Sequence, residues 1–308
     1  MSKLKILVTG GAGYKGVILC KGLLDLNHDV TIIDNFMYGY QGILHLLEYK
    51  KLRIIEKDIR NIELSDVSDF DLIFHLAGIS GMPACKLNMH SAIEINDKAT
   101  EKIISLLSPS QKIIYASTTS VYGSKNDLCT EQLVLDSFPS TYAETKYNAE
   151  KYVLSHNNSI VFRFATIFGI SPRMRDDLLV NDFTRRAVQE RTINLFDSKS
   201  KRTFLHIRDA INAYLMCIDE FSNTEGLYNV GSSNLNLSKQ EIANEIRMQL
   251  DFEIVESQLK DLDVRNFTID FSKINKLGYV SNVSLSEGVI ELLNLYKFYN
   301  LYRPYKVI

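Results

Sequence analysis

The chain has 308 residues, of which 45% are hydrophobic and 23% charged, and its formal net charge is -2. This composition excludes a disordered chain, and 35 basic against 37 acidic residues provide no overall basic field for nucleic acid. No run of about 18 apolar residues occurs, so we expect no membrane-spanning segment. The cysteines are widely spaced, which predicts reduced thiols, no metal site and a cytoplasmic location. They are Cys20, Cys85, Cys129 and Cys217.

Short β-branched runs alternate with longer amphipathic stretches through the first 170 residues. This alternation predicts an α/β fold, a doubly wound parallel Rossmann sheet with helices on both faces. The predicted strands are Lys5–Thr9, Val30–Asp34, Leu52–Glu56, Leu72–Leu76, Lys112–Ser117 and Ile160–Phe164. The predicted helices lie near Gly16–Asn27, Gly42–Lys50, Ala92–Leu107 and Tyr142–His156.

The pattern changes after Gly169, where the chain leaves the sheet through a Ser-Pro break. The alternation of strand and helix then resumes, with a strand near Phe204–Ile207, a helix from Arg208 and a strand near Leu227–Gly231. The remainder reads as a smaller α+β lobe that ends in a helix over Ser286–Tyr299. We therefore predict a Rossmann domain over residues 1–169 plus 203–231, and a smaller lobe over residues 170–202 plus 232–308.

A glycine-rich loop follows the first predicted strand and opens a helix. Its glycines have the spacing GxxGxxG: Gly10 suits a tight turn, Gly13 allows the backbone to approach a pyrophosphate, and Gly16 suits close packing of the helix. The N-terminus of the helix offers free N–H groups to phosphates. This arrangement predicts that residues 1–169 plus 203–231 bind a dinucleotide.

Asp34 ends the second predicted strand, 18 residues after Gly16. A carboxylate here accepts hydrogen bonds from the adenosine ribose and repels a 2′-phosphate, so we expect NAD rather than NADP. Lys15 stands where an apolar residue is usual. Its side chain either extends along the surface to solvent or reaches a phosphate.

The fifth predicted strand ends in a cluster of hydroxyls that includes Thr118, at the edge where open α/β folds bind ligands. Tyr142 and Lys146 share one face of the next helix, and a nearby ammonium lowers the pKa of a phenol. We expect Tyr142 to be the general base and Thr118 to hold the reacting oxygen. A second pair, Tyr147 and Lys151, overlaps the first but faces elsewhere, about 140° further round the helix.

With these residues in place, the chain resembles the extended short-chain dehydrogenase/reductase family, in its NAD-dependent nucleotide-sugar epimerase/dehydratase branch. The resemblance extends through nearly the whole chain and includes the glycine loop, Thr118 and the Tyr142/Lys146 pair. It implies that Asp58 and Ile59 hold adenine, and that Asn96 is structural. The implied cofactor-binding set is Gly10, Gly13, Tyr14, Lys15, Gly16, Asp34, Asn35, Asp58, Ile59, Leu76, Ala77, Gly78, Asn96, Tyr142 and Lys146.

The resemblance also implies substrate contacts. Arg202 matches an arginine that grips the nucleotide diphosphate, and Arg265 is the nearest candidate for a second one. Arg173 and Arg175 fit either a clamp on phosphate or sugar, or an exposed basic loop. Cys85 is either a thiol acid beside a ketone or a packed cysteine. The implied substrate-binding set is Ser80, Thr118, Thr119, Thr166, Arg173, Arg202 and Arg265.

Departures from the family pattern reduce the number of reactions that this chain could catalyse. Members that dehydrate or decarboxylate carry acidic residues where this chain has Thr119 and Ser120. We therefore expect an NDP-sugar 4-epimerase of surface polysaccharide biosynthesis, which oxidises the C4 hydroxyl. The alternatives are an NDP-hexose or GDP-heptose 4-dehydrogenase, a keto-sugar reductase, or, more remotely, a non-catalytic NAD-sensing protein. The partner is a nucleotide-diphosphate sugar, and the resemblance implies a homodimer.

Overall fold

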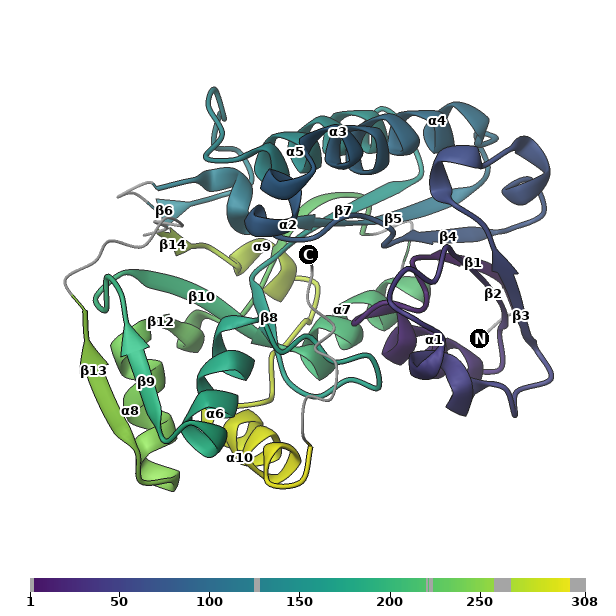
Figure 1. The fold of residues 1–308 in the computed structure, drawn as a ribbon. Helices are drawn as coiled ribbons and strands as arrows, with labels where there is room; N and C mark the ends of the chain where they lie inside the picture. The colour runs from purple at the N-terminus through teal and green to yellow at the C-terminus, as the bar shows by residue number, and fades with distance from the viewer. Residues whose placement is uncertain (1–2, 125–127, 220, 222–223, 258–266, 300–308) are drawn as a thin grey trace.

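A seven-stranded parallel sheet forms the centre of the protein, in a computed structural model that describes residues 3–124, 128–219, 221, 224–257 and 267–299. The strand order is β11-β7-β5-β4-β1-β2-β3, and the part from β7 to β3 is labelled in Figure 1. The doubly wound sheet predicted from the sequence is confirmed, and six predicted strands match observed ones to within one residue at each end. The six strands are β1 (Lys5–Thr9), β2 (Asp29–Asp34), β3 (Leu52–Glu56), β4 (Leu72–His75), β5 (Lys112–Thr118) and β7 (Ser159–Phe164). The seventh strand of the sheet is β11 (Gly226–Val230).

Helices cover both faces of the sheet, because successive side chains of each strand point to opposite sides. Ile6 of β1 belongs to a core cluster shared with α1 and α7, whereas Leu7 belongs to a second cluster shared with α4 and α5. Figure 1 shows these two helical layers on opposite sides of the sheet. The helices are α1 (Gly16–Asp25), α4 (Ala99–Leu106), α5 (Thr141–Leu154) and α7 (Ile207–Asp219). Among the helices of the described residues, none combines the length and apolar composition that a bilayer crossing requires.

Three helical segments differ from the prediction. The helix expected over residues 42–50 is a 3-10 helix, η1 (Gln41–Leu46), since Leu44 and Leu47 stay exposed and only one short face is buried. The helix expected over residues 92–107 is composite, because a π-helical turn, η4 (Ile93–Lys98), interrupts it after α3 (Met89–Ala92). A short helix before them, α2 (Met82–Leu87), was not predicted, because its Gly-Pro surroundings favour a turn. Single-turn 3-10 helices are η2 (Ile59–Asn61), η3 (Leu64–Asp66), η5 (Thr119–Tyr122) and η7 (Ser233–Leu235).

A smaller lobe lies beyond β7 and consists of small sheets and three larger helices (Figure 1). The strand predicted near Phe204 is present as β10, but it pairs with β8 and β12 instead of the central sheet. After β10 the chain rejoins the Rossmann layer at α7. The division into a Rossmann domain over residues 1–169 plus 203–231 and a smaller lobe stays a prediction. The elements are β8 (Thr166–Phe168), β9 (Thr192–Leu195), β10 (Lys201–His206), β12 (Asn236–Ser238), β13 (Glu253–Glu256), α6 (Leu179–Gln189), α8 (Lys239–Gln249) and α10 (Leu285–Tyr296), with short β6 (Leu128–Cys129), β14 (Thr268–Ile269) and α9 (Ser272–Asn275).

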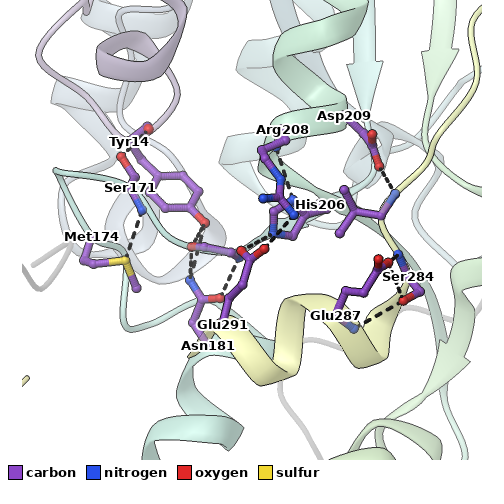
Figure 2. A network of polar contacts seen from close by, with 12 residues as sticks. Tyr14, Ser171, Met174, Asn181, His206, Arg208, Asp209, Ser284, Glu287 and Glu291 are labelled. Atoms are coloured by element: carbon purple, nitrogen blue, oxygen red, sulfur yellow. Dashed lines mark hydrogen bonds and ion pairs between the residues drawn. The ribbon is translucent and has the colours of Figure 1, made fainter. Parts of the chain in front are cut away.

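A polar network around Tyr14 joins the glycine loop to the smaller lobe (Figure 2). The Tyr14 hydroxyl donates to the Gly169 carbonyl at 2.6 Å, and the Tyr14 carbonyl accepts from Ser171 Oγ at 2.8 Å. Asn181 of α6 accepts from the Gly169 N–H at 3.0 Å and donates to the Tyr14 hydroxyl at 3.4 Å. Burial raises the pKa of Tyr14 well above its usual value, so the phenol stays protonated as a donor.

The C-terminal helix α10 contacts the start of α7 through a second part of this network (Figure 2). Glu291 accepts from Arg208 at 2.6 Å and lies 3.3 Å from Nε2 of His206. Burial and the charge of Arg208 lower the pKa of His206 to about 4, so its imidazole is neutral at pH 7. The Asp209 carboxylate accepts from the Val283 N–H at 3.0 Å. These contacts hold the last helix against the Rossmann layer.

A buried ion pair holds α5 against β7. Arg163 of β7 contacts Glu150 of α5 at 2.6 Å, and both side chains are almost completely buried. Ser117 of β5 donates to the same carboxylate, and Arg163 donates to the Tyr122 hydroxyl at 3.0 Å. The Ser140 side chain caps the helix by accepting from Ala143 N–H at 3.2 Å. The N-terminal turn of α5 is thereby placed at the carboxyl edge of the sheet.

Replacing Glu150 by Gln tests this ion pair. We expect the free energy of unfolding to fall by about 3–5 kcal/mol, because Arg163 is left buried without its counter-charge. Urea denaturation followed by circular dichroism measures the change. Glu144→Gln, an exposed position on the same helix, is the control and should change stability by less than about 0.5 kcal/mol. An equal, small effect of both substitutions would contradict this account.

Candidate active site

The glycine loop between β1 and α1 forms an open cradle at the carboxyl edge of the sheet. Gly10 has a φ of +71°, and a Cβ there would lie 2.6 Å from the Ala77 nitrogen. A Cβ at Gly16 would lie 2.4 Å from the Gly10 carbonyl oxygen, so both glycines are required by the packing of the loop itself. A Cβ at Gly13 would meet only the Gly10 oxygen, at 3.1 Å. The outer side of Gly13 is therefore open for a ligand to approach the backbone.

A first cavity lies beside this loop, between the ends of β2 and β3. Asp34 accepts from the Ala12 N–H at 3.0 Å and from the Phe36 N–H at 2.9 Å. Burial raises the pKa of the Asp34 carboxyl, and these backbone hydrogen bonds oppose the rise. On another wall, hydrogen bonds from Arg60 lower the pKa of Asp58 to about 2. The predicted cofactor residues that line this cavity are Gly10, Gly13, Asp34, Asn35, Asp58, Ile59, Leu76, Ala77 and Gly78.

A second cavity contains the three predicted catalytic side chains. Thr118 ends β5, Tyr142 begins α5, and Lys146 follows one turn later; all three line this cavity. The hydroxyls of Thr118 and Ser80 are near enough to the Tyr142 phenol to lower its pKa. Thr118 also donates to Ser120 Oγ at 3.0 Å and accepts from the Ser120 N–H at 3.1 Å. The structure therefore brings the hydroxyl, the phenol and the ammonium to one place.

The overlapping pair has different surroundings. The Tyr147 ring packs on Phe138, with ring centroids 4.7 Å apart, and Lys151 Nζ lies 4.5 Å from the centre of the Tyr147 ring. Neither Tyr147 nor Lys151 is among the described residues that line the two cavities. The choice of Tyr142 over Tyr147 agrees with this geometry.

The pKa of Tyr142 differs from the expectation that a neighbouring lysine lowers it. Burial raises the pKa of Tyr142 above its usual value, although hydrogen bonds with Ser80 and Thr118 lower it. The cation that lowers this pKa most is Arg175. The net lowering expected from the Tyr142/Lys146 spacing is wrong, since sequence spacing contains no information on burial.

Lys146 is itself deeply buried. Its Nζ lies 4.0 Å from the centre of the Tyr115 ring. Burial lowers the pKa of Lys146 to about 7, and the charge of Glu150 opposes this change. Lys146 is therefore close to half protonated at neutral pH, and an anion in the cavity would favour its charged form.

Lys15 also lines the second cavity. Its Nζ lies 4.2 Å from the centre of the Phe164 ring and donates to the Tyr214 hydroxyl at 3.3 Å. Burial, together with the charges of Lys146 and Arg175, lowers the pKa of Lys15 to about 7. The Lys15 side chain is half-buried, and its amine lies beside the Phe164 and Tyr214 rings in the cavity, which disagrees with extension along the surface to solvent.

The lining of the second cavity is rich in cations and hydroxyls. Within the described residues, it contains no aspartate or glutamate. Arg173 stacks on Tyr38, with its guanidinium carbon 4.1 Å from the ring centre, and Arg175 pairs with Asp177 through two contacts of 2.6 and 2.7 Å. The reading of these arginines as an exposed basic loop is wrong. The lining cations are Lys15, Lys146, Arg173 and Arg175, and the predicted substrate residues present are Ser80, Thr118, Thr119, Thr166 and Arg173.

Other predicted residues lie outside the cavities. Asn96 supports the loop after β4: its Oδ1 accepts from the Ile79 N–H at 2.8 Å, and its Nδ2 donates to the Ile79 carbonyl at 2.9 Å. Arg202 is buried on β10 and is not among the lining residues described. Arg265 lies outside the described residues. Cys85 is packed, and burial raises the pKa of its thiol to about 11, which favours the structural reading.

Several lining residues were not among the predicted site residues. Tyr38 lines both cavities, from the segment after β2, and Phe164 lines the second cavity from the end of β7. Arg175, for which the sequence left a clamp and an exposed basic loop open, faces the second cavity close to Gly81, where a Cβ would lie 3.8 Å from its guanidinium. Phe164 could have been found, because it ends a strand at the ligand-binding edge of the sheet. Tyr38 carries no such signal, since its place depends on the path of a loop.

The chain belongs to the NAD dependent epimerase/dehydratase family, whose sequence profile matches residues 6–231. Membership confirms three predictions made from the sequence: the family itself, an enzyme, and NAD as the cofactor. The two cavities fit this cofactor, because an open glycine cradle joins a cavity that contains a strand-end carboxylate to one that contains the Tyr142/Lys146 pair.

Several known proteins are similar over nearly the whole chain. "Uncharacterized UDP-glucose epimerase YtcB" of Bacillus subtilis is 28% identical, over 87% of this chain and 85% of its own length. UDP-N-acetyl-alpha-D-glucosaminuronate decarboxylase of Bacillus cytotoxicus is also 28% identical, over 96% and 93%. The crystal structure of UDP-glucuronic acid 4-epimerase from Bacillus cereus, in complex with UDP-glucuronic acid and NAD, superimposes with a TM-score of 0.81 at 26% identity, over 95% of this chain and 98% of the other.

Replacing Asp34 by Ala tests the first cavity. We expect the Kd for NAD to rise by about 10- to 100-fold, because hydrogen bonds to a charged group contribute about 1.5–3 kcal/mol. The preference for NAD over NADP should shrink as well, since the carboxylate that repels a 2′-phosphate is gone. Isothermal titration calorimetry measures both affinities.

Asp29→Ala, at the other end of β2, is the matched control and should leave the affinity for NAD unchanged. If the two variants bind NAD equally, the first cavity is not the adenosine site.

Proposed function

We propose that this protein is an NAD-dependent 4-epimerase of a nucleotide-diphosphate sugar in surface polysaccharide biosynthesis. The observation that carries the proposal is the meeting of Thr118, Tyr142 and Lys146 in a cavity whose described lining contains no carboxylate. The reaction oxidises the sugar at C4 and then reduces the ketone on its other face. Bound NAD supplies the acceptor, and later the donor, of the hydride.

Tyr142 is the proton acceptor for the C4 hydroxyl. The neighbouring hydroxyls of Thr118 and Ser80 lower the pKa of its phenol and so favour the phenolate. Thr118 can donate a hydrogen bond to the C4 oxygen and hold that oxygen as hydroxyl and as ketone. Lys146 and Arg175 contribute positive charge around the phenolate. The proton then returns from Tyr142 to the same oxygen when the ketone is reduced.

The absence of acids from the described lining supports epimerisation over elimination or decarboxylation. Thr119 and Ser120, which follow Thr118, both line the cavity with hydroxyl groups. Loss of water from a sugar needs a proton donor and a base in addition to the tyrosine. Hydride transfer in both directions needs only the three residues already named.

The charges of the second cavity also support an acidic sugar. Four cationic side chains, Lys15, Lys146, Arg173 and Arg175, line it together with the hydroxyls of Thr119 and Thr166. Hydroxyls and cations are the groups that bind a carboxylate. The structurally similar Bacillus cereus enzyme is a UDP-glucuronic acid 4-epimerase, as is a relative from Arabidopsis thaliana, "UDP-glucuronate 4-epimerase 4". We therefore propose a sugar with a carboxylate at C5 as the substrate.

The remaining parts of the proposal concern the nucleotide and the assembly. We assign the nucleotide diphosphate to the smaller lobe. Arg202 of β10 is the residue that would bind it, because Arg202 matches the family's diphosphate-binding arginine. We further propose a cytoplasmic homodimer. The four cysteines are buried and form no disulfide among the described residues, which suits a reducing compartment. Sedimentation of the purified protein measures the oligomeric state.

Tyr142→Phe is the direct test of the proton acceptor. We expect kcat to fall by about 10²- to 10⁴-fold, because general acid–base catalysis is lost. The Kd for NAD should stay within about twofold, since the ring is retained. Tyr147→Phe changes the tyrosine of the overlapping pair on the same helix and should leave kcat unchanged. Equal activity of the Tyr142 variant and the unmodified protein would exclude Tyr142 as the base.

A panel of nucleotide sugars tests the reaction and the substrate class. We expect UDP-glucuronate to have a kcat/KM at least about tenfold above that of UDP-glucose, because a charged hydrogen bond is worth about 1.5–3 kcal/mol. NMR should identify the 4-epimer, with no net change in NADH absorbance. Stoichiometric NADH instead would indicate the 4-dehydrogenase alternative, and equal use of both sugars would refute the acidic substrate.

A further inference from the structure

Lys15 has a fixed position within the glycine loop. The preceding residue, Tyr14, is held by its carbonyl and by its hydroxyl, through Ser171 and Gly169 (Figure 2). Beyond this anchor the Lys15 side chain enters the second cavity, with its Nζ beside the Phe164 ring and 3.3 Å from the Tyr214 hydroxyl. The loop therefore presents a half-buried amine to the cavity.

The surroundings of this amine contain no compensating anion. In the part of the chain that the structure describes, Lys15 forms no ion pair, and the cavity lining has no carboxylate. The ring faces of Phe164 and Tyr214 stabilise its positive charge modestly. Its charged neighbours, Lys146 and Arg175, are cations too. A protonated Lys15 is therefore a positive charge with no carboxylate opposite it in the described lining of the cavity.

The nicotinamide end of the cofactor belongs in this cavity. In the proposed reaction, the hydride leaves the same carbon whose hydroxyl proton passes to Tyr142, so the hydride acceptor has to lie beside Tyr142. The adenosine end has its own candidates, Asp34 and Asp58, in the first cavity. The oxidised nicotinamide ring carries one positive charge, and the reduced ring, which has gained a hydride with its two electrons, is neutral.

We propose that Lys15 destabilises the cationic, oxidised nicotinamide relative to the neutral, reduced one, and so raises the reduction potential of the bound cofactor. The charge favours the first half-reaction, the oxidation at C4. An apolar residue at this position would have no such effect. The inference rests on the proposed function for the identity of the ligand, but its test requires no sugar.

The test is the affinity of the protein for each form of the cofactor. NADH is titrated by its fluorescence and NAD by calorimetry, with the unmodified protein and with Lys15→Met. We expect the ratio of Kd for NAD to Kd for NADH to fall about tenfold in the variant. By the thermodynamic cycle, a tenfold change for two electrons is a potential about 30 mV lower.

Two further variants serve as controls. Lys15→Arg retains the charge, so its ratio of Kd for NAD to Kd for NADH should stay close to that of the unmodified protein. Lys21→Met removes an exposed lysine of α1, which pairs with Asp25, and should leave both affinities unchanged. The folding of each variant is checked by its thermal unfolding.

Other outcomes would overturn the proposal. If both Kd values rise by the same factor in Lys15→Met, the lysine binds a phosphate of the cofactor, and the ratio is unaffected. If neither Kd changes, the side chain only fills space. A failure of the proposed function is separate, because it would appear as absence of turnover with every sugar while the ratio still shifts.

The pH dependence provides an independent readout. Below pH 7 Lys15 is charged, so the ratio should be high, and it should fall as the pH rises through about 7. Lys146 titrates in the same range, so Lys15→Met should retain only the smaller change due to Lys146. Equal pH dependence in both proteins would contradict the proposal. The titratable or charged groups around Lys15 are Tyr14, Tyr142, Lys146, Arg175 and Tyr214.

Discussion

The position of α5 depends on one buried ion pair, between Glu150 on that helix and Arg163 on β7. Their side chains are 2% and 3% exposed, respectively. Two charges this deep in a protein require that their other hydrogen-bonding groups also have partners, and Ser117 and Tyr122 provide them. The proposed catalytic pair occupies the first turns of the same helix. The ion pair therefore determines where the phenol and the ammonium meet the end of β5, and its carboxylate opposes the loss of charge on the lysine.

The layered part of the fold could be predicted because its signals are local. Each strand of the sheet is a short apolar run, and burial on both faces makes such runs continuous. The exceptions are elements whose form depends on contacts distant in sequence. The π-helical turn η4 places Asn96 against Ile79, and nothing in the surrounding residues indicates the extra residue of that turn. Likewise β10 has an ordinary strand sequence, and only its neighbours β8 and β12 decide that it joins a different sheet.

The site residues that could be predicted are those identified by their spacing along the chain. The three glycines, Asp34 and the Tyr142/Lys146 pair follow from intervals along the chain, and the structure brings them to the two cavities. Charge states were not predictable in this way. Burial raises the pKa of Tyr142 and lowers that of both cavity lysines, and burial is a property of the whole fold. Arg175 was similarly undecided in sequence, because only the path of its loop places the guanidinium near the phenol.

The edge strand β11 has a consequence for the order in which the protein folds. The Tyr122 hydroxyl, which accepts a hydrogen bond from Arg163, donates its own proton to Asn229 of β11 at 2.7 Å, and the Asn229 N–H is bound by Glu131. Residues 226–230 are the last part of the central sheet to leave a ribosome. Until then β7 is an unprotected edge, and the polar network behind the site lacks its final acceptor. The site can therefore be completed during synthesis only after about three quarters of the chain has been made.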